Sequence, residues 1–221
     1  MKTIRVTGKG QIKVHPDVTR LTLTLEGLER EYGKAVKRSS EDTEALKALL
    51  EPFGFERKDT KTLSFSVDPE YESYQEKQVW KQRLTGYRFR HVLKLEFDSD
   101  NEKLGKILYA LANAKAVAPE FRISYTVKDP EASKNALLAA AVKDSAAKAK
   151  VLAKAAGAKL GELQSIDYSW GEIDFEVRPM NRMESKMMVA GAAADYGSYD
   201  MDIEPDDIEV TDTVTLVWEI V

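Results

Sequence analysis

Hydrophobic and polar residues alternate with a period of two along residues 3–14. This alternation predicts a β-strand with one apolar and one solvated face. Two apolar-side positions are Gly8 and Gly10, where the missing side chain permits a bend, a bulge or the close approach of another element. The apolar side carries Ile4, Val6, Gly8, Gly10, Ile12 and Val14.

The following segment predicts a second strand and then a helix. Residues 21–25 continue the alternation with leucine at every second position, and Gly27 ends the strand. From Glu31 to Pro52 the period changes to 3.6, which predicts an amphipathic helix. The apolar face of this helix is predicted to contain Tyr32, Val36, Ser39, Thr43, Leu46, Leu50 and Phe53.

Two further strands are predicted at 63–67 and 84–97, the second with the sequence "LTGYRFRHVLKLEF". The connection between them, "DPEYESYQEKQVWKQ", is long and polar. It indicates a hairpin whose arms extend beyond the main sheet. A short helix at 101–114 and a strand at 121–127 follow.

The longest predicted helix runs from about Pro130 to Ala156, with Asp129 as its N-cap and Gly157 at its C-terminal end. Twelve of the 27 residues from 132 to 158 are alanine, so this helix can lie close to a sheet or another helix. Strands are predicted after it at 161–170 and 208–220. The contact face is predicted to run along Leu138, Val142, Ser145, Ala149 and Leu152.

The order of these elements predicts an α+β fold, with a largely antiparallel sheet and helices packed on one face. Strand, helix, strand and strand follow one another over 18–97 and again over 119–221. This repeat indicates two βαββ-like halves, about 1–100 and 101–221, within one domain spanning 1–221.

Residues 172–206 break the periodic pattern and indicate a functional loop, an interface arm or partial disorder. Clustered methionine is more often adaptable packing at an interface than a soft Cu(I) site, although thioethers suit that ion. The predicted interaction residues are Met180, Met183, Met187, Met188, Tyr196 and Tyr199, and Met201 stands nearby.

Acidic residues gather at the end of the same segment, in "DYGSYDMDIEPDD". Their oxygens could serve a hard cation, but the spacing and the mid-loop glycine of an EF-hand are lacking, which favours a solvated acidic loop. No metal or other cofactor is therefore predicted. The acidic residues are Asp195, Asp200, Asp202, Glu204, Asp206 and Asp207.

Charge and composition narrow the classes of partner. The 33 basic and 37 acidic residues are intermixed and give a formal net charge of −4, which offers no basic field for nucleic acid. Cysteine is absent, which excludes thiolate catalysis and cysteine-based metal sites. No apolar stretch approaches the ~20 residues that span a bilayer. The first residues, "MKTIRVTGKG", lack a signal-peptide core, so we expect a cytoplasmic protein without membrane insertion.

The chain contains two histidines, and both are interpreted as structural. His15 and Asp17 flank Pro16, which suits a turn between strands, with Asp17 accepting hydrogen bonds from nearby backbone N–H groups. His91 lies on the apolar side of its strand, where a hydrogen bond in the core or at an edge is favoured over a metal. No P-loop, Gly-x-Ser-x-Gly or His-Glu-x-x-His pattern is present, so no catalytic residue is predicted.

Four segments together resemble the SIMPL-domain family. The opening "IRVTGKGQIKVHPDVTRLTLTLEG" is similar to the family's Val-x-Gly-x-Gly strand, Pro-Asp step and second strand. The likeness continues through Gly86-Tyr87, the helix "ALLAAAVKDSAAKAKVLAKAAGAKLGEL" and the closing "PDDIEVTDTVTLVWEIV". Two departures are the missing leader and an Asp-Asp pair at 206–207 where members usually have Gly-Glu.

The resemblance implies an α+β fold, and in some bacterial members large ring-like or channel-like oligomers. It also implies export or an envelope location for most members and a link to stress responses for some, and it offers no catalytic residues. We therefore expect a non-enzymatic, self-associating scaffold or interaction protein that forms homo-oligomers, with a stress response as one candidate process. The alternatives are a small-ligand or metal-binding protein with a pocket near 172–206, an unrecognised hydrolase, and a signalling adaptor.

Overall fold

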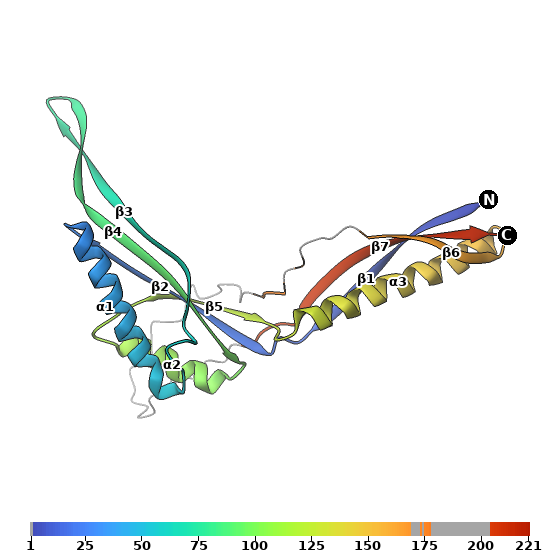
Figure 1. The fold of residues 1–221 in the computed structure, drawn as a ribbon, viewed down its shortest axis with the longest axis horizontal. Helices are drawn as coiled ribbons and strands as arrows, with labels where there is room; N and C mark the ends of the chain where they lie inside the picture. Colours follow the sequence, from blue (N-terminus) through green and yellow to red (C-terminus); the bar gives the residue numbers. More distant parts are fainter. Residues whose placement is uncertain (1, 169–172, 174, 178–203) are drawn as a thin grey trace, which may run out of the picture. The chain divides into compact units, whose positions relative to one another are not determined.

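The computed structural model describes residues 2–168, 173, 175–177 and 204–221. The chain divides into two compact units. Unit 1 combines described residues from 1–17, 126–177 and 205–221, and unit 2 consists mainly of the continuous stretch Val18–Tyr125. Each unit has its own sheet and at least one helix (Figure 1).

Unit 2 contains a four-stranded sheet and two α-helices (Figure 1). Its strand order is β3-β4-β2-β5, and the β2–β4 and β3–β4 pairs are antiparallel. The elements are β2 (Val18–Glu29), α1 (Tyr32–Leu50), the 3₁₀ turn η1 (Glu51–Phe53), β3 (Lys61–Glu76), β4 (Val79–Asp98), α2 (Asn101–Asn113) and β5 (Glu120–Thr126).

The core of unit 2 lies between one face of this sheet and the two helices. Alternating leucines of β2 pair with apolar residues of β4, as in Leu21 with Leu95 and Leu23 with Leu93. They pack against the buried faces of α1 and α2, which include Leu46 and Leu104. Most of the predicted α1 face is buried, but in the first turn Ala35 is buried whereas Tyr32 and Val36 are exposed. The residues buried as predicted are Ser39, Thr43, Leu46 and Leu50.

Unit 1 contains a three-stranded antiparallel sheet and one long helix (Figure 1). The strand order is β1-β7-β6, so β7 is central. β1 pairs with β7 along its whole length, from Thr3 with Glu219 to Val14 with Ile208. The elements are β1 (Thr3–Val14), α3 (Pro130–Ala155), β6 (Leu160–Asp167) and β7 (Ile208–Ile220).

Helix α3 packs closely on β1 at the two glycines. A Cβ atom at Gly8 would overlap the carbonyl oxygen of Ala141 and lie 2.8 Å from the Cβ of Ser145. A Cβ at Gly10 would overlap the carbonyl oxygen of Leu137. The buried Ser145 hydroxyl donates a hydrogen bond of 2.9 Å to the carbonyl of Val6. Gly8 and Gly10 therefore serve the close approach of another element, one of the three roles predicted for them.

The contact face of α3 differs from the predicted one. Ser145 and Ala149 are buried as expected, but Leu152 is half exposed, and Leu138 and Val142 are only partly buried. The middle of the helix approaches the backbone of β1 closely at Gly8 and Gly10. The contact there is therefore made mainly by small residues. The buried residues are Leu137, Ala141, Ser145, Ala149 and Ala153.

The α+β class is confirmed, with antiparallel strands and helices on one face, and the strands divide between two sheets. The N-caps of α2 and α3 are formed by aspartates, since Asp100 accepts from the N–H of Lys103 and Asp129 accepts from that of Ala132, the latter as predicted. Among the helices in the described part of the chain, none is long and apolar enough to cross a membrane.

Candidate functional site

His15 and Asp17 do not interact with each other. The Asp17 carboxylate accepts a 2.8 Å hydrogen bond from the N–H of Lys128, and the Asp17 N–H donates to the carbonyl of Thr126 at 3.1 Å. His15 Nδ1 instead lies 3.2 Å from Oδ1 of Asp207 on an exposed surface. Asp17 accepts a backbone N–H as predicted, but the prediction of a nearby donor is wrong, because Lys128 is 111 residues away in the sequence.

His91 is held by two threonines. Its Nδ1 lies 3.0 Å from the Thr43 hydroxyl, and its Nε2 lies 2.9 Å from the Thr62 hydroxyl. Because the Thr43 hydroxyl donates to the carbonyl of Ser39 at 2.7 Å, it accepts from His91, which places the proton on Nδ1. Burial, followed by the charge of Lys47, lowers the pKa of His91 below 6.5. The ring is hydrogen-bonded at the edge of the core, as predicted.

The predicted interaction residues lie outside the described residues. They are Met180, Met183, Met187, Met188, Tyr196 and Tyr199. Asp195, Asp200 and Asp202 fall there too, whereas Glu204, Asp206 and Asp207 are described. Within the described ranges, no three His, Asp or Glu side chains are grouped so that they could hold a metal ion.

The β3–β4 hairpin continues beyond the end of β2, which stops where Glu29 pairs with Tyr87 (Figure 1). We call residues 70–85 of this hairpin the ribbon. Its two-residue turn consists of Lys77 and Gln78, both with positive φ (49° and 66°), as a type I′ turn requires. The predicted hairpin with extended arms is therefore present.

The root of the ribbon is fixed by local packing. Thr85 is an extra residue in β4, because Glu70 pairs with Gly86 and Tyr71 pairs with Leu84. The Thr85 hydroxyl donates to the carbonyl of Glu70 at 2.8 Å. At Gly86, a Cβ atom would overlap the carbonyl oxygen that ends β2, so only glycine lets the two backbones meet there. The bulge and the glycine together set the direction in which the ribbon leaves the sheet.

The two faces of the ribbon differ in charge. Paired residues of antiparallel strands lie on the same side, so the register assigns each side chain to a face. One face, which we call the uncharged face, consists of Tyr71, Ser73, Gln75, Trp80, Gln82 and Leu84. The opposite face consists of Glu72, Tyr74, Glu76, Val79, Lys81 and Arg83.

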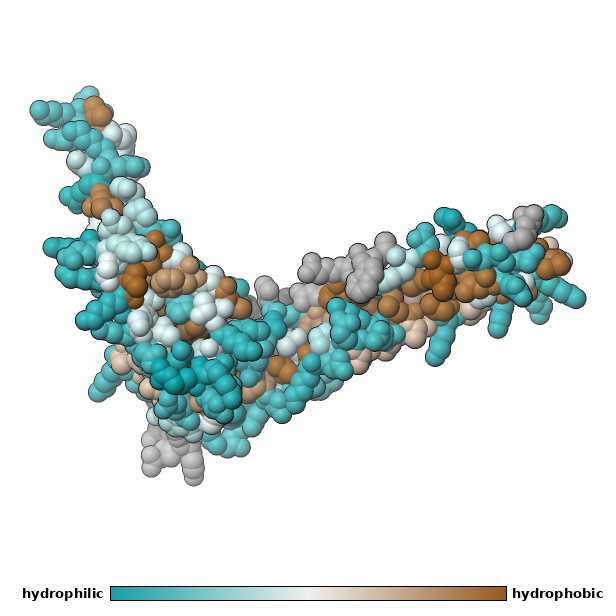
Figure 2. All heavy atoms as spheres, viewed as in Figure 1, coloured by the Kyte–Doolittle hydropathy of each residue, from teal (hydrophilic) through white to brown (hydrophobic). Residues whose placement is uncertain are grey.

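Large apolar groups on the uncharged face are open to solvent. Trp80 is 71% exposed, Tyr71 57% and Leu84 46%, and Tyr71 and Leu84 stand directly opposite each other. Figure 2 shows hydrophobic side chains along the hairpin among hydrophilic ones. An exposed tryptophan in a patch without charge is typical of an interaction surface.

The charged face satisfies its own groups. Arg83 donates to Glu72 at 2.7 Å and its guanidinium lies 5.7 Å from the centre of the Tyr74 ring. Lys81 donates to Glu76 at 2.6 Å. These cross-strand pairs leave the charged face with balanced charge, and they stabilise the ribbon in the same conformation that presents the uncharged face.

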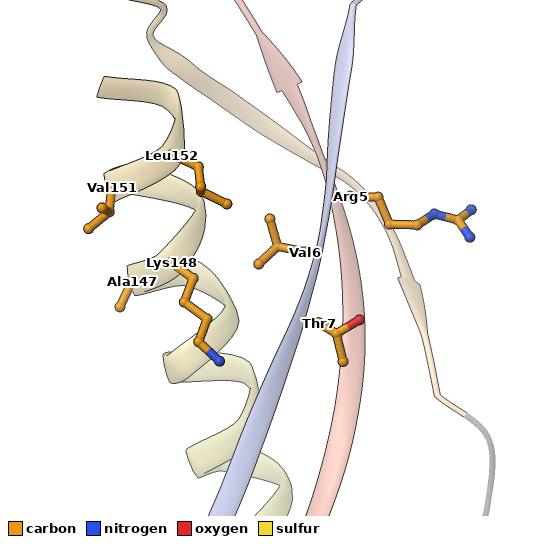
Figure 3. Close-up of a pocket in the computed structure, with 7 residues that line it drawn as sticks. All are labelled: Arg5, Val6, Thr7, Ala147, Lys148, Val151 and Leu152. Atoms are coloured by element: carbon orange, nitrogen blue, oxygen red, sulfur yellow. The ribbon is translucent and has the colours of Figure 1, made fainter. Parts of the chain in front are cut away.

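Unit 1 carries a second surface, a groove of about 580 Å³ between β1 and α3 (Figure 3). Val6 points toward the helix, whereas Arg5 and Thr7 point away to the other side of the sheet. Val151 is 67% exposed and Leu152 50%, although both are apolar. The lining residues are Arg5, Val6, Thr7, Ala147, Lys148, Val151 and Leu152.

Sequence reasoning identified the hairpin but missed the two faces of the ribbon. The bulge at Thr85 shifts the alternation of β4 by one position, so a simple period of two puts Leu84 and Tyr87 on different faces. The uncharged set becomes visible only in the paired register. The groove left no sequence signal, because it depends on the distance between α3 and β1.

The fold and these surfaces define an α+β protein of antiparallel sheets with exposed edges and apolar patches. Residues 4–218 match the family described as SIMPL, protein of unknown function (DUF541). The chain belongs to the SIMPL family, and the resemblance noted in the sequence is confirmed. A comparison with curated proteins finds no match.

Proposed function

We propose that this protein is a non-enzymatic scaffold that self-associates, with the uncharged face of the ribbon as a contact between copies. The observation that carries the proposal is the exposure of Trp80, Tyr71 and Leu84 on a face without charged side chains. Burial of such a face releases water from apolar surface and leaves no unpaired charge behind.

A second copy suits this face better than a partner of strong charge. An uncharged face placed against an identical one meets no like-charge repulsion, and related glutamine and serine side chains can hydrogen-bond to each other. The ribbon is also preformed by its turn, its bulge and its cross-strand ion pairs, so association requires little additional ordering.

Light scattering coupled to size exclusion tests the proposal on the full chain. We expect a mass above that of the monomer in the micromolar range. Trp80→Ser combined with Leu84→Ser should lower this mass. The matched control is Val79→Ser, which removes an apolar side chain of 58% exposure from the opposite face and should leave the mass unchanged.

Two results would contradict the proposal: a strictly monomeric wild-type protein, and an assembly that the Trp80→Ser and Leu84→Ser changes do not alter. Far-UV circular dichroism checks that the variants keep their fold. A role in a stress response and a cytoplasmic location stay predictions from the sequence.

A further inference from the structure

Among the described strands, the two outer strands of the unit 1 sheet differ in charge. β1 and β6 are the outer strands of the order β1-β7-β6. Residues 2–14 contain four basic and no acidic side chains, whereas β6, "LGELQSID", contains two acidic and no basic ones. The charged residues are Lys2, Arg5, Lys9 and Lys13 on the β1 side and Glu162 and Asp167 on β6.

Part of the β1 edge has backbone groups turned away from the sheet. The N–H of Lys9 donates to Oδ2 of Asp144 at 2.7 Å and therefore points away from β7. Residues two apart in a strand orient their N–H and C=O groups to the same edge. Alternate residues in Thr3–Thr7 thus present these groups outward, whereas the Lys9 N–H is already bonded to Asp144 of α3.

The groove opens beside this same stretch. Val6 faces α3, and the half-exposed Leu152 points toward β1 from the helix, whereas Val151 points to the far side (Figure 3). An apolar side chain that entered beside Val6 would cover Leu152. A strand added at this edge would therefore gain both backbone hydrogen bonds and apolar contact.

β6 carries apolar side chains on the matching side of the sheet. Leu163 pairs with Trp218 and Ile166 with Leu216, so both lie on the side that faces α3. They share this side because Gln164 is an extra residue in the strand. Leu163 is 40% exposed and Ile166 57%, since α3 packs mainly over the other half of the sheet.

The acidic residues of β6 lie on the opposite side of the sheet. Asp167 pairs with Thr215, and Glu162 precedes Leu163, so both face away from α3. Arg5 and Lys9 occupy the same side of β1, four positions apart. Glu162 and Asp167 are five residues apart in sequence, and the stretch between them contains the extra residue Gln164. The two carboxylates thus lie on either side of Leu163 and Ile166 along the strand.

We infer that β6 of a second copy adds to β1 at residues 3–7 and extends the sheet from one copy to the next. The added strand is parallel to β1, because β1 and β6 are both antiparallel to β7 and the apolar sides must stay together. Leu163 of the second copy enters the groove beside Val6. Its Glu162 and Asp167 lie against Arg5 and Lys9.

This contact rests on the proposed self-association and is separate from the ribbon. It joins two different edges, so every copy can accept a strand at β1 and donate one at β6. Copies related in this way associate head to tail, whereas contact between identical ribbon faces joins two copies only.

Charge reversal at the two edges tests the inference by sedimentation velocity on the full chain. Variant one carries Arg5→Glu and Lys9→Glu, and variant two carries Glu162→Lys and Asp167→Lys. Each variant alone should form a smaller assembly than the wild type, because the β1 edge of one copy then repels the β6 edge of the next. An equal mixture should regain the wild-type mass, since acidic β1 meets basic β6 and the unchanged edges remain complementary.

The control is Lys37→Glu with Lys58→Glu, which changes the net charge equally at two exposed positions of unit 2 and should keep the wild-type mass. If the wild type assembles and either variant keeps its full mass, or mixing fails to restore assembly, the inference is wrong and the ribbon proposal stands. A monomeric wild type contradicts both. Recovery on mixing also shows that the variants are folded.

Discussion

The carboxylate of Asp17 accepts the backbone N–H of Lys128, 2.8 Å away, and so fastens the end of the first strand to the segment that leads into α3. The same residue donates its own N–H to the carbonyl of Thr126. Asp17 thereby satisfies backbone groups of a crossing segment, in the way that a capping residue satisfies a helix end.

Replacing Asp17 with alanine should lower the free energy of unfolding by about 1 kcal/mol, because the Lys128 N–H loses its acceptor. Asp17→Asn keeps an acceptor oxygen and should cost less. Urea titration followed by circular dichroism measures both. Equal midpoints for the alanine variant and the wild type would show that the hydrogen bond contributes nothing.

Replacing Gly8 with alanine should destabilise unit 1 by about 1–3 kcal/mol or more, because the new Cβ overlaps the Ala141 carbonyl and α3 must move. Gly33→Ala is the matched control. Gly33 lies in α1, and a Cβ added there would meet no atom within 4 Å, so alanine should raise stability by about 0.5–1 kcal/mol. Thermal unfolding of the two variants should shift in opposite directions.

Replacing Ser145 with alanine should cost about 1 kcal/mol, since the buried hydroxyl loses its bond to the Val6 carbonyl. Ser145→Val should cost more, because the added methyl group meets the close contact at Gly8. Denaturant titration measures the free energy of unfolding of both variants and so compares the two costs. A valine variant as stable as the alanine variant would mean that the helix can retreat from β1 without cost.

His91 should make stability depend on pH. Its pKa is lower in the folded chain than the ordinary 6.5, so the unfolded chain binds more protons as the pH falls. The stability that this residue contributes is present above about pH 6.5 and is lost as the pH falls through the lower folded value. His91→Gln should remove this dependence while keeping groups that can bond Thr43 and Thr62. Denaturation midpoints across this range, compared between variant and wild type, isolate the effect from His15. Identical pH profiles would contradict it.

Periodicity predicted the elements well because both faces of most strands have distinct composition. The alternation of residues 3–14 corresponds closely to β1, and the Asp129-Pro130 pair marks the start of α3. The contact face of α3 was predicted correctly only at Ser145 and Ala149, because alanine surrounds the helix and no side-chain pattern distinguishes the buried side. Burial there follows from Gly8 and Gly10 on another strand.

Partners distant in sequence could not be predicted from local patterns. The acceptor role of Asp17 was expected, but its donor Lys128 depends on how the chain returns to the end of β1. His15 lies near one aspartate in the sequence and contacts another, Asp207. The edge pairing inferred for unit 1 likewise depends on the extra Gln164, which sequence alternation does not show.

The pairing of Thr3 with Glu219 has a consequence for how the protein is made. β1 precedes all the other described strands in the sequence, and its neighbour in the sheet, β7, follows all of them. A ribosome therefore releases β1 long before β7, while Val18–Tyr125 emerges as one stretch able to form its own sheet. During that interval β1 has no β7 to pair with, and its apolar side is not yet covered.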